Sequence, residues 1–573
     1  MEYLNKYKEW LENAEIDEET KEELRNIEGN NDEIQDRFYK NLEFGTAGLR
    51  GIVGAGTNRM NKYTVGKATQ GLANYIIKHN GQKRGVAIAY DCRNMSEEFS
   101  KLASLILNAN GIKTYRFESL RPTPELSFAV RELNCISGIV ITASHNPPQY
   151  NGYKVYWEDG AQISTPVDEE ITNEVNNVKG YSEIKEISEE NAIKKGLYNE
   201  IGKNIDDKYI EYLKTLILNE DIIKKEAKNI KIVYTPLCGT GKMLATRLLD
   251  ELGFKNVYLV KEQSEPNGNF PTLKYPNPED PAAFDLALRL AKEVDADIVI
   301  ANDPDADRIG LHIKDTKTGE YILFNGNMIG LTVADYLINQ KREKGQLAPN
   351  TALIKTIVSS NMTDRICEKN NVKLFETLTG FKNIAAMIKK FEKENSYNCI
   401  MGFEESYGCL VGDKVRDKDG IAAMMILVEA ASYYKSKGMT LWDNMNKLYD
   451  TYGYYKEHTI SVTLEGAEGA QKIKNIMEKV RVNPPKEIGK YKVVRFKDYS
   501  NGNIKDFSNE IETKEDLPKS NVLYFELEND FWCCMRPSGT EPKIKFYLGV
   551  VGDSLEDAKR LVEDLTDSMK EIM

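Results

Sequence analysis

The order of expected secondary-structure elements repeats three times along this chain, and the repeat limits the fold more than any other feature. Apolar runs of strand type alternate with segments of helical periodicity after the first ~80 residues. The three copies begin at the strands RGVAIAY (84–90), KIVYTPL (231–237) and ALIKTIVSS (352–360). Because strands and helices alternate, we expect an α/β fold with mixed, largely parallel sheets and helices on both faces.

A polar loop follows the last strand of each copy. These loops are ASHNPP (143–148), DPDADR (303–308) and FEESYG (403–408). Ligand sites in such sheets form beyond the carboxyl ends of the strands. Loops so rich in Ser, His, Asp and Glu are hard to explain by packing alone, so we expect them to carry the function.

Two segments lie outside the repeat or refine it. The first 24 residues read as an acidic amphipathic helix, and the chain from about Lys456 reads as a small α+β domain whose hairpin is NVLYFELENDFWCCM (521–535). In the first copy, SEEFSKLASLILNANG reads as a helix with Ser96 as its N-cap and Gly111 as its end. At 573 residues the chain is long enough for three to five domains.

Charge and composition exclude several classes of protein. The net charge of −12 argues against nucleic acid as the main partner. No run approaches about 18 consecutive apolar residues, and the N-terminus has no signal-like apolar region, so we expect a cytoplasmic protein without a membrane partner. The eight cysteines include no C-x-x-C pair and read as reduced core thiols.

The loop DPDADR has the spacing of a site for a hard cation. Asp303, Asp305 and Asp307 stand at alternate positions after a strand, so their oxygens can converge on an ion such as Mg²⁺. An EF-hand is excluded, because its sixth position needs Gly and is Arg308, and its twelfth needs Glu and is Lys314. The alternative is a solvated acidic turn, but three crowded carboxylates would repel one another without a cation.

Two further motifs bear on phosphate. RPSGTEPK (536–543) combines a guanidinium, two hydroxyls and a glycine, which suits a phosphate monoester, although a turn between strands would look similar without Arg536. PLCGTGKML (236–244) resembles a nucleotide-binding loop only weakly. It has Pro236 where Gly is needed and Met243 where Ser or Thr is needed, so Lys242 reads as a helix-surface lysine.

The stretch TASHNPPQYNGYK (142–154) places a hydroxyl beside an imidazole. A nucleophile elbow is a poor match, because its two glycines are replaced by Thr142 and Asn146. Neighbouring side chains tend to diverge, so we do not expect His145 to act as the general base of Ser144. The pair Asn151-Gly152 predicts a turn that brings Lys154 back toward the serine.

Together these loops describe phosphoryl transfer with a small phosphorylated polyol, and the chain resembles the α-D-phosphohexomutase superfamily. The motifs T-A-S-H-N-P-P, D-P-D-A-D-R, G-F-E-E-S-Y-G and R-P-S-G-T-E-P occur in the family's order. The resemblance implies a heart-shaped protein with a central cleft, three similar α/β domains and a C-terminal α+β domain. The implied domains are a phosphoserine-loop domain with an N-terminal helical extension, a metal-binding domain, a sugar-binding domain and a phosphate-binding domain, at 1–210, 211–322, 323–455 and 456–573.

The resemblance also implies roles for individual residues. Ser144 would carry the phosphoryl group and, through a phosphate oxygen, share Mg²⁺ with Asp303, Asp305 and Asp307. Lys154 would be the general acid and base. The residues implied to stabilise the transferring group are His145, Arg50 and Arg308. Those implied to bind the substrate are Thr379, Gly380, Glu404, Ser406, Lys418, Arg536, Ser538, Gly539 and Thr540.

The implied activity is that of an Mg²⁺-dependent phosphoglucomutase, which interconverts glucose 1-phosphate and glucose 6-phosphate through a hexose 1,6-bisphosphate and could also accept mannose phosphates. The alternatives are a phosphopentomutase or a glucose 1,6-bisphosphate synthase on the same fold, or a non-catalytic sugar-phosphate sensor. Gly408 stands where some bacterial relatives carry His, which leans away from the phosphoglucosamine type. The resemblance implies small sugar phosphates as partners and no protein partner.

Overall fold

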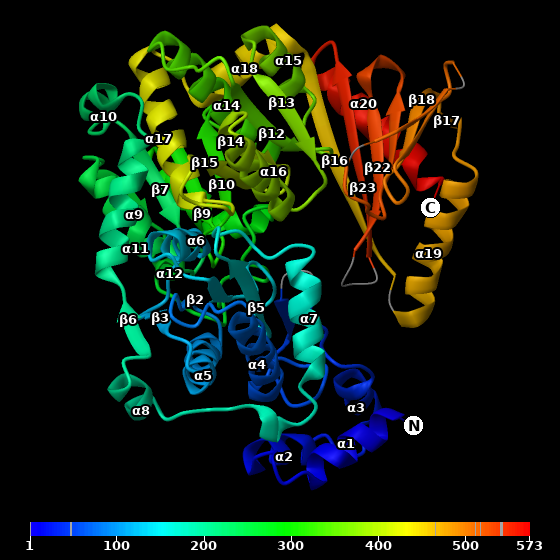
Figure 1. Ribbon diagram of the computed structural model, residues 1–573. Coiled ribbons are helices and arrows are strands. Elements are labelled where there is room, and N and C mark those ends of the chain that lie inside the picture. The colour runs from blue at the N-terminus through cyan, green and yellow to red at the C-terminus, as the bar shows by residue number, and fades with distance from the viewer. Residues whose placement is uncertain are drawn as a thin grey trace. The chain divides into compact units, whose positions relative to one another are not determined.

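A computed structural model gives the architecture of the chain (Figure 1). It describes residues 2–45, 48–464, 466–509, 511–515, 517–538 and 543–572. The chain forms two compact units, the first made of residues 1–324, 388–390 and 407–438, and the second of 325–387, 391–406 and 439–573. The segment 407–438 therefore belongs with the first unit although it lies late in the sequence.

The N-terminal segment forms three short helices, α1 (Glu2–Glu12), α2 (Glu18–Arg25) and α3 (Asn31–Phe38). The expectation of one continuous helix over the first 24 residues is wrong. Asp17 caps α2 by accepting a hydrogen bond from the Thr20 amide at 3.0 Å, and it also accepts from the Tyr63 hydroxyl. A capping carboxylate in extended backbone ends one helix phase and starts another.

The first sheet of the first unit is mixed. Its strand order is β1-β5-β4-β2-β3-β6, in which β2 pairs in parallel with both β3 and β4, whereas β5 runs antiparallel to β4 and β1. Helices α5 and α6 lie on opposite sides of it (Figure 1). The strands are β1 (Gly48–Ile52), β2 (Val86–Tyr90), β3 (Thr114–Phe117), β4 (Ser137–Ile141), β5 (Tyr150–Trp157) and β6 (Tyr198–Ile201). The helices are α4 (Lys62–Lys78), α5 (Ser96–Ala109), α6 (Thr123–Glu132), α7 (Val167–Asn177), α8 (Glu189–Lys194) and α9 (Lys203–Thr215).

The helix predicted to start after an N-cap at Ser96 instead begins at Ser96 itself. Its N-cap is Met95, which has φ of 67° and makes no side-chain cap hydrogen bond. The Ser96 hydroxyl donates to Asp91 at 2.7 Å and accepts from the Asn151 side chain at 3.0 Å, so residues outside the helix occupy it. The predicted order of strands and helices in this copy is confirmed.

The second sheet of the first unit has the order β11-β10-β9-β7-β8, with β7 parallel to β8 and β9, and β10 antiparallel to β9 and β11. Helix α17, from the late segment, packs against α10, α11 and β10. The strands are β7 (Lys231–Thr235), β8 (Asn256–Leu259), β9 (Ile298–Asn302), β10 (Ile309–Lys314) and β11 (Tyr321–Phe324). The helices are α10 (Glu220–Glu226), α11 (Gly241–Glu251), α12 (Lys261–Ser264), α13 (Asp285–Val294) and α17 (Gly420–Ser436), and the late segment also contains β15 (Gly408–Val411).

The second unit contains the third copy of the repeat. Strand β12 pairs in parallel with β13 and β14, as the alternation of elements predicts. The strands are β12 (Thr351–Thr356), β13 (Lys373–Thr377) and β14 (Asn398–Glu404). The helices are α14 (Gly326–Glu343), α15 (Met362–Asn370), α16 (Phe381–Glu394), which has residues 388–390 in the first unit, and α18 (Leu441–Tyr452).

The last part of the second unit is an antiparallel sheet with order β16-β23-β22-β21-β18-β19-β20, with β17 pairing β18. The predicted hairpin is confirmed as β21 and β22. The strands are β16 (Tyr454–Thr463), β17 (Glu487–Ile488), β18 (Tyr491–Asp498), β19 (Asn503–Asp506), β20 (Ile511–Lys514), β21 (Leu523–Leu527), β22 (Trp532–Pro537) and β23 (Lys543–Gly552), and the helices are α19 (Gly466–Val482) and α20 (Leu555–Lys570). The fold class is therefore confirmed, while the four domain boundaries stay predictions.

The cysteines agree with the expectation of reduced thiols, most of them in the core. All eight cysteines are free, and six of them are buried. Within the described ranges, every helix is too short or too polar to cross a bilayer.

The packing of α14 on β14 leaves no room for a side chain at Gly330, which predicts a destabilised variant. A Cβ at this position would lie 2.2 Å from the Phe403 ring. Although Ala favours helix over Gly, overpacking in a core costs about 1–3 kcal/mol, so we expect Gly330→Ala to lower the free energy of unfolding by about that amount. Urea denaturation measures the change.

A double variant provides the control for this prediction. In Gly330→Ala/Phe403→Leu the smaller leucine side chain makes room for the new methyl group. The double variant should therefore lose less unfolding free energy than the two single variants lose in sum. Additive losses would show that the two positions do not collide.

Candidate active site

The loop ASHNPP (143–148), called the serine loop below, and the loop DPDADR (303–308), called the acidic loop, come together in the first unit. Ser144 lies just after β4, and Asp303 lies just after β9. The Ser144 hydroxyl donates a hydrogen bond to Asp303 Oδ2 at 2.8 Å. Both residues are buried. Two loops 159 residues apart in sequence thus place a hydroxyl oxygen against a carboxylate, as the resemblance implies for Ser144 and the three aspartates.

The backbone at Ser144 adopts an uncommon conformation. Its φ is 53°, in the left-handed region, and its amide donates to the Thr142 hydroxyl at 2.8 Å. The expectation that the side chains of Ser144 and His145 diverge is wrong, because Ser144 Oγ and His145 Nδ1 lie 3.1 Å apart. Left-handed backbone breaks the alternation of an extended chain and brings neighbouring side chains to one side.

The expected turn at Asn151-Gly152 is also wrong, although its consequence holds. Both residues lie within strand β5, and the chain reverses earlier, where the Tyr150 amide donates to the Pro147 carbonyl at 3.1 Å. Gly152 allows close approach of backbones, since a Cβ there would lie 2.4 Å from the Thr142 carbonyl oxygen. Strand β5 then brings Lys154 to the acidic loop.

The three aspartates form a candidate metal site. They are at most 1% exposed, and one oxygen from each lies within 4.8 Å of the others. Two of these carboxylates, Asp305 and Asp307, each keep a buried Oδ1 that has no hydrogen-bond partner among the described residues. Buried oxygens of hard carboxylates without partners are what a divalent cation would coordinate, so the residues present fit such an ion.

Two lysines balance part of this buried negative charge. Lys154 Nζ lies 2.9 Å from Asp305 Oδ2, and Lys418 Nζ lies 3.1 Å from Asp307 Oδ2. The repulsion among the aspartates is therefore reduced by protein cations as well as by any bound metal. Lys418 thus lies beside the acidic loop in the first unit, whereas the resemblance assigns it to the sugar.

The three carboxyl groups differ in acidity. Burial and the charges of Asp305 and Asp307 raise the pKa of Asp303 well above its ordinary value. Burial also acts to raise the pKa of Asp305, but Lys154 and hydrogen bonds outweigh it and hold that pKa below the ordinary value. Burial, with the charges of Arg308 and Arg50, lowers the pKa of His145 well below its ordinary value, so its imidazole is neutral at pH 7.

The predicted arginines lie at the same loops. The Arg308 amide donates to Asp303 Oδ1 at 3.0 Å, and its guanidinium forms an ion pair with Glu279. Arg50, on β1, donates to the Asn146 side chain at 3.3 Å. Positive charge therefore faces the serine loop from two further elements.

The sequence interpretation missed Thr123, at the start of α6. Its hydroxyl donates to Asp305 Oδ2 at 2.9 Å, and its amide donates to the Asp305 carbonyl, also at 2.9 Å. Thr123 and Lys154 hold the same oxygen and leave Oδ1 of Asp305 for a cation. Only a threonine beside prolines before a helix could have signalled it, and that pattern is too common to stand out.

The residues implied to bind the sugar lie in the second unit. Glu404 is buried at the end of β14, and Ser406 follows it, half-buried. Thr379 and Gly380 precede α16, where Gly380 has φ of 104° and the Thr379 carbonyl accepts from the Asn383 side chain at 3.0 Å. Glu404 thus ends β14 and the turn at Gly380 follows β13, the two strands that flank β12.

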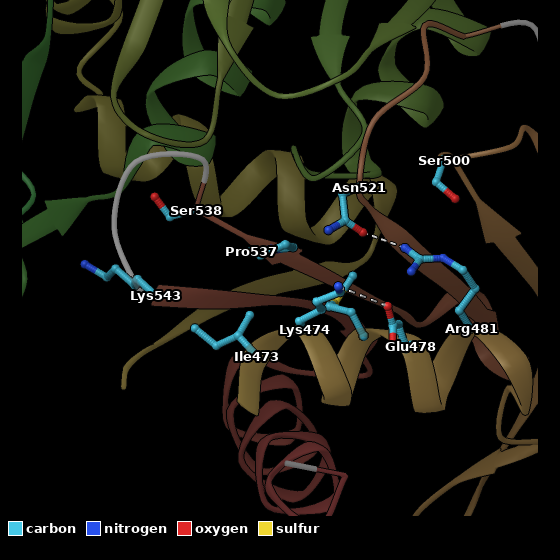
Figure 2. A pocket seen from close by; sticks show the side chains of 10 residues that line it. Ile473, Lys474, Glu478, Arg481, Ser500, Asn521, Pro537, Ser538 and Lys543 are labelled. Carbon is cyan, nitrogen blue, oxygen red and sulfur yellow. Dashed lines mark hydrogen bonds and ion pairs between the residues drawn. The ribbon is translucent and has the colours of Figure 1, made fainter. Parts of the chain in front are cut away.

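The implied phosphate loop follows β22. Arg536 and Ser538 are half-buried, and the Ser538 amide donates to the Lys543 carbonyl at 2.7 Å, while Gly539 and Thr540 lie outside the described residues. Ser538 and Lys543 line a pocket with a volume of about 520 Å³. Figure 2 shows these two residues on one side of it and Arg481 on the other. The surroundings of Ser538 therefore include cations that suit an anion.

Lys242 is confirmed as a lysine on the surface of a helix. It lies on α11 and forms an ion pair with the exposed Glu265.

Three family models match consecutive parts of the chain. They describe the α/β/α domains I, II and III of phosphoglucomutase/phosphomannomutase and match residues 41–182, 207–317 and 325–452. The first range contains the serine loop, the second the acidic loop, and the third the loop FEESYG (403–408), called the sugar loop below. The fold and the order of sites therefore define a member of the α-D-phosphohexomutase superfamily.

Similar proteins agree with this class. The phosphoglucomutases of Staphylococcus aureus (strain MRSA252) and Staphylococcus haemolyticus (strain JCSC1435) are each 38% identical to the chain, over 92% and 91% of it and 93% of their own lengths. Two crystal structures share the fold. A Thermus thermophilus protein described as a phosphomannomutase has a TM-score of 0.70 at 20% identity (93% of this chain, 99% of that one), and the open form of the Paramecium phosphoglucomutase pp63/parafusin has 0.69 at 18% (93% and 96%).

The chain belongs to the phosphoglucomutase/phosphomannomutase family. It is accordingly an enzyme, an isomerase that acts as an intramolecular phosphotransferase.

The acidic triad predicts a divalent-cation site that depends on each carboxylate. Asp307→Asn removes one of the charges whose buried oxygen lacks a partner, so we expect affinity for Mn²⁺ and Mg²⁺ to fall by at least about 100-fold. Mn²⁺ binding followed by electron paramagnetic resonance, with Mg²⁺ as competitor, measures this. The matched control Asp295→Asn changes an exposed aspartate, paired with Lys314, and should bind as the unchanged protein does. Equal affinity for the two variants would contradict the prediction.

Glu405 predicts a pH-dependent stability in the second unit. Burial and the charge of Glu404 raise its pKa from 4.5 to about 7. The folded chain therefore holds a proton that the unfolded chain has lost, so this contribution is present below about pH 4.5 and is lost as the pH rises to about 7. We expect Glu405→Gln to flatten the fall in unfolding free energy between about pH 5 and about pH 8 by roughly 1–2 kcal/mol.

Urea denaturation at several pH values measures this effect. The control Glu394→Gln changes an exposed glutamate of the same unit and should leave the pH profile as it is. A Glu405→Gln profile as steep as that of the unchanged protein would rule the effect out.

Proposed function

We propose that this enzyme is an Mg²⁺-dependent phosphoglucomutase that interconverts glucose 1-phosphate and glucose 6-phosphate through a phosphate carried on Ser144. The observation that carries the proposal is the Ser144 hydroxyl, 2.8 Å from one of three buried aspartates that can hold a cation. The naming of its 38% identical relatives as phosphoglucomutases supports the sugar. A glucose 1,6-bisphosphate is the intermediate, and mannose phosphates are possible substrates of the same site.

The proposed reaction moves one phosphoryl group at a time. The bond between phosphorus and Ser144 Oγ breaks, a bond from phosphorus to a sugar hydroxyl oxygen forms, and one proton passes from that hydroxyl to the serine oxygen. The bisphosphate then reorients, and its other phosphate passes to Ser144 by the reverse step. The products differ from the substrates only in which hydroxyl carries the phosphate.

The residues of the first unit have distinct proposed tasks. Lys154 handles the proton, and its position 2.9 Å from Asp305 supports this by placing it at the acidic loop. His145 and the two arginines, Arg50 and Arg308, donate hydrogen bonds to the phosphoryl oxygens, where charge stabilisation gains most of the rate. A divalent cation held by the three aspartates would add positive charge at the same oxygens.

The proposed substrate-binding residues are those of the second unit together with Lys418. Glu404 and Ser406 would bind sugar hydroxyls, and Thr379 and Gly380 would belong to a loop that faces the substrate. The phosphate that is not being transferred would be held by the loop of Arg536, Ser538, Gly539 and Thr540. Arginine and hydroxyl donors suit such a dianion.

Replacement of the proposed carrier tests this function. We expect Ser144→Ala to lower kcat for glucose 1-phosphate by at least about 10³-fold, because the residue that forms the covalent intermediate is gone. A coupled assay for glucose 6-phosphate, with a glucose 1,6-bisphosphate activator, measures the rate. The control Ser182→Ala changes an exposed serine and should keep full activity. If Ser144→Ala turned over substrate at the original rate, the phosphoserine proposal would be wrong.

A panel of sugar phosphates, with each product measured directly, identifies the sugar. Relative kcat/KM for glucose 1-phosphate, mannose 1-phosphate and ribose 1-phosphate compares how well the sugar loops fit each hydroxyl pattern. A preference for ribose 1-phosphate would favour a phosphopentomutase instead.

A further inference from the structure

The carbonyl oxygens of the serine loop converge on one buried side chain that the proposed reaction does not use, Arg93. It follows β2 and is 3% exposed. Its guanidinium donates to the carbonyl of Ser144 at 2.6 Å, to that of Pro147 at 2.8 Å and to that of Tyr150 at 3.0 Å. It also donates to the carbonyl of Asn146. One side chain thus satisfies three acceptors of the serine loop and the carbonyl of Tyr150 at the start of β5.

Arg93 is itself held in place. Asp91 and Arg93 form a fully buried ion pair, with Arg93 Nε 3.4 Å from Asp91 Oδ2. The other Asp91 oxygen accepts from the Arg93 amide at 2.9 Å and from the Ser96 hydroxyl at 2.7 Å. The guanidinium also lies 5.1 Å from the centre of the Phe270 ring. Charge, hydrogen bonds and an aromatic face fix its orientation from three sides.

The chemistry of the loop explains why a guanidinium is needed. Pro147 and Pro148 remove two amides that could have bonded within the loop, and Ser144 holds left-handed backbone that is costly for a residue with a side chain. Carbonyls turned inward without donors would be buried and unsatisfied. A planar group with five N–H donors can meet several of them at once, which an ammonium cannot do in a fixed geometry.

We propose that Arg93 is a positioning residue for phosphoryl transfer, which holds the backbone of the serine loop so that Ser144 Oγ stays directed at the acidic triad. The proposal rests on the proposed phosphoserine function. Arg93 acts through the loop carbonyls, so its geometry matters more than its charge. A small shift of the carrier oxygen would suffice to slow transfer, since misplacement by about 1 Å can cost about 10²-fold in rate.

Variants of Arg93 test this role. We expect Arg93→Met and Arg93→Lys to lower kcat by about 10²-fold with KM changed less than about 3-fold, because substrate binding does not involve the carbonyls. The decisive measurement is single-turnover transfer of phosphate from labelled Ser144 to the sugar, expressed per phosphorylated molecule. A merely structural role would not slow this step in the folded fraction. Full transfer rate in Arg93→Lys would overturn the proposal, because charge alone would then be enough.

The matched control is Arg59→Met. Arg59 is also buried at 4% exposure and donates to the carbonyls of Asp36 and Asn58, but in a different loop. We expect it to lose thermal stability as Arg93→Met does while keeping its transfer rate. Equal loss of transfer in the two variants would overturn the proposal.

A second variant keeps the test decisive if Arg93→Met does not fold. Asp91→Asn leaves the guanidinium but removes its buried counter-charge, so we expect transfer to slow by about 10-fold, less than in Arg93→Lys. An unchanged rate in Asp91→Asn and Arg93→Lys together would overturn the proposal. Ser144→Ala separates the two hypotheses: if it stays active, the phosphoserine function fails, whereas an inactive Ser144→Ala beside fully active Arg93 variants fails only the positioning role.

Discussion

Three carboxylates buried at the end of one strand are the constraint on which the first unit depends. Asp303, Asp305 and Asp307 could not share this space as bare charges, because burial and mutual repulsion both oppose ionisation. Lys154 from β5 and Lys418 from the late segment pair with two of them. Breaking a buried pair costs about 3–5 kcal/mol, so the acidic loop and its two lysines form one interdependent structure.

Buried carboxylates also hold the late segment, residues 407–438, in place within the first unit. Asp417, next to Lys418 in sequence, accepts hydrogen bonds from the Tyr156 hydroxyl at 2.6 Å and from the side-chain amide of Gln162 at 2.9 Å. Asp419 caps α17 and accepts from the Tyr209 hydroxyl. Buried carboxylates with several donors fix both the path of the loop and the position of its lysine. A segment that follows the sugar loop in sequence thereby places Lys418 beside the acidic loop.

The sequence predicts the order of elements and the positions of the loops well, because apolar strands, helical periodicity and clustered acids are local signals. It fails where a distant partner decides the outcome. Ser96 does not cap its helix because Asp91 and Asn151 occupy its hydroxyl, and Asn151-Gly152 do not turn because strand β1 pairs with them. Arg93 could not be recognised either, since backbone carbonyls have no sequence signature and its acceptors lie 51–57 residues away.

The division of residues between the two units has a consequence for mechanism. Ser144, the acidic triad and the cations around them all belong to the first unit, whereas Glu404, Ser406 and the loop at Arg536 belong to the second. The hydrogen bonds of Ser144 come from the first unit's own side chains and backbone. In the proposed function, cation binding and alignment of Ser144 would therefore not require substrate, and the sugar phosphate would be held by residues of the second unit together with Lys418. On this view changes in the sugar loops alter specificity, while the transfer chemistry stays the same.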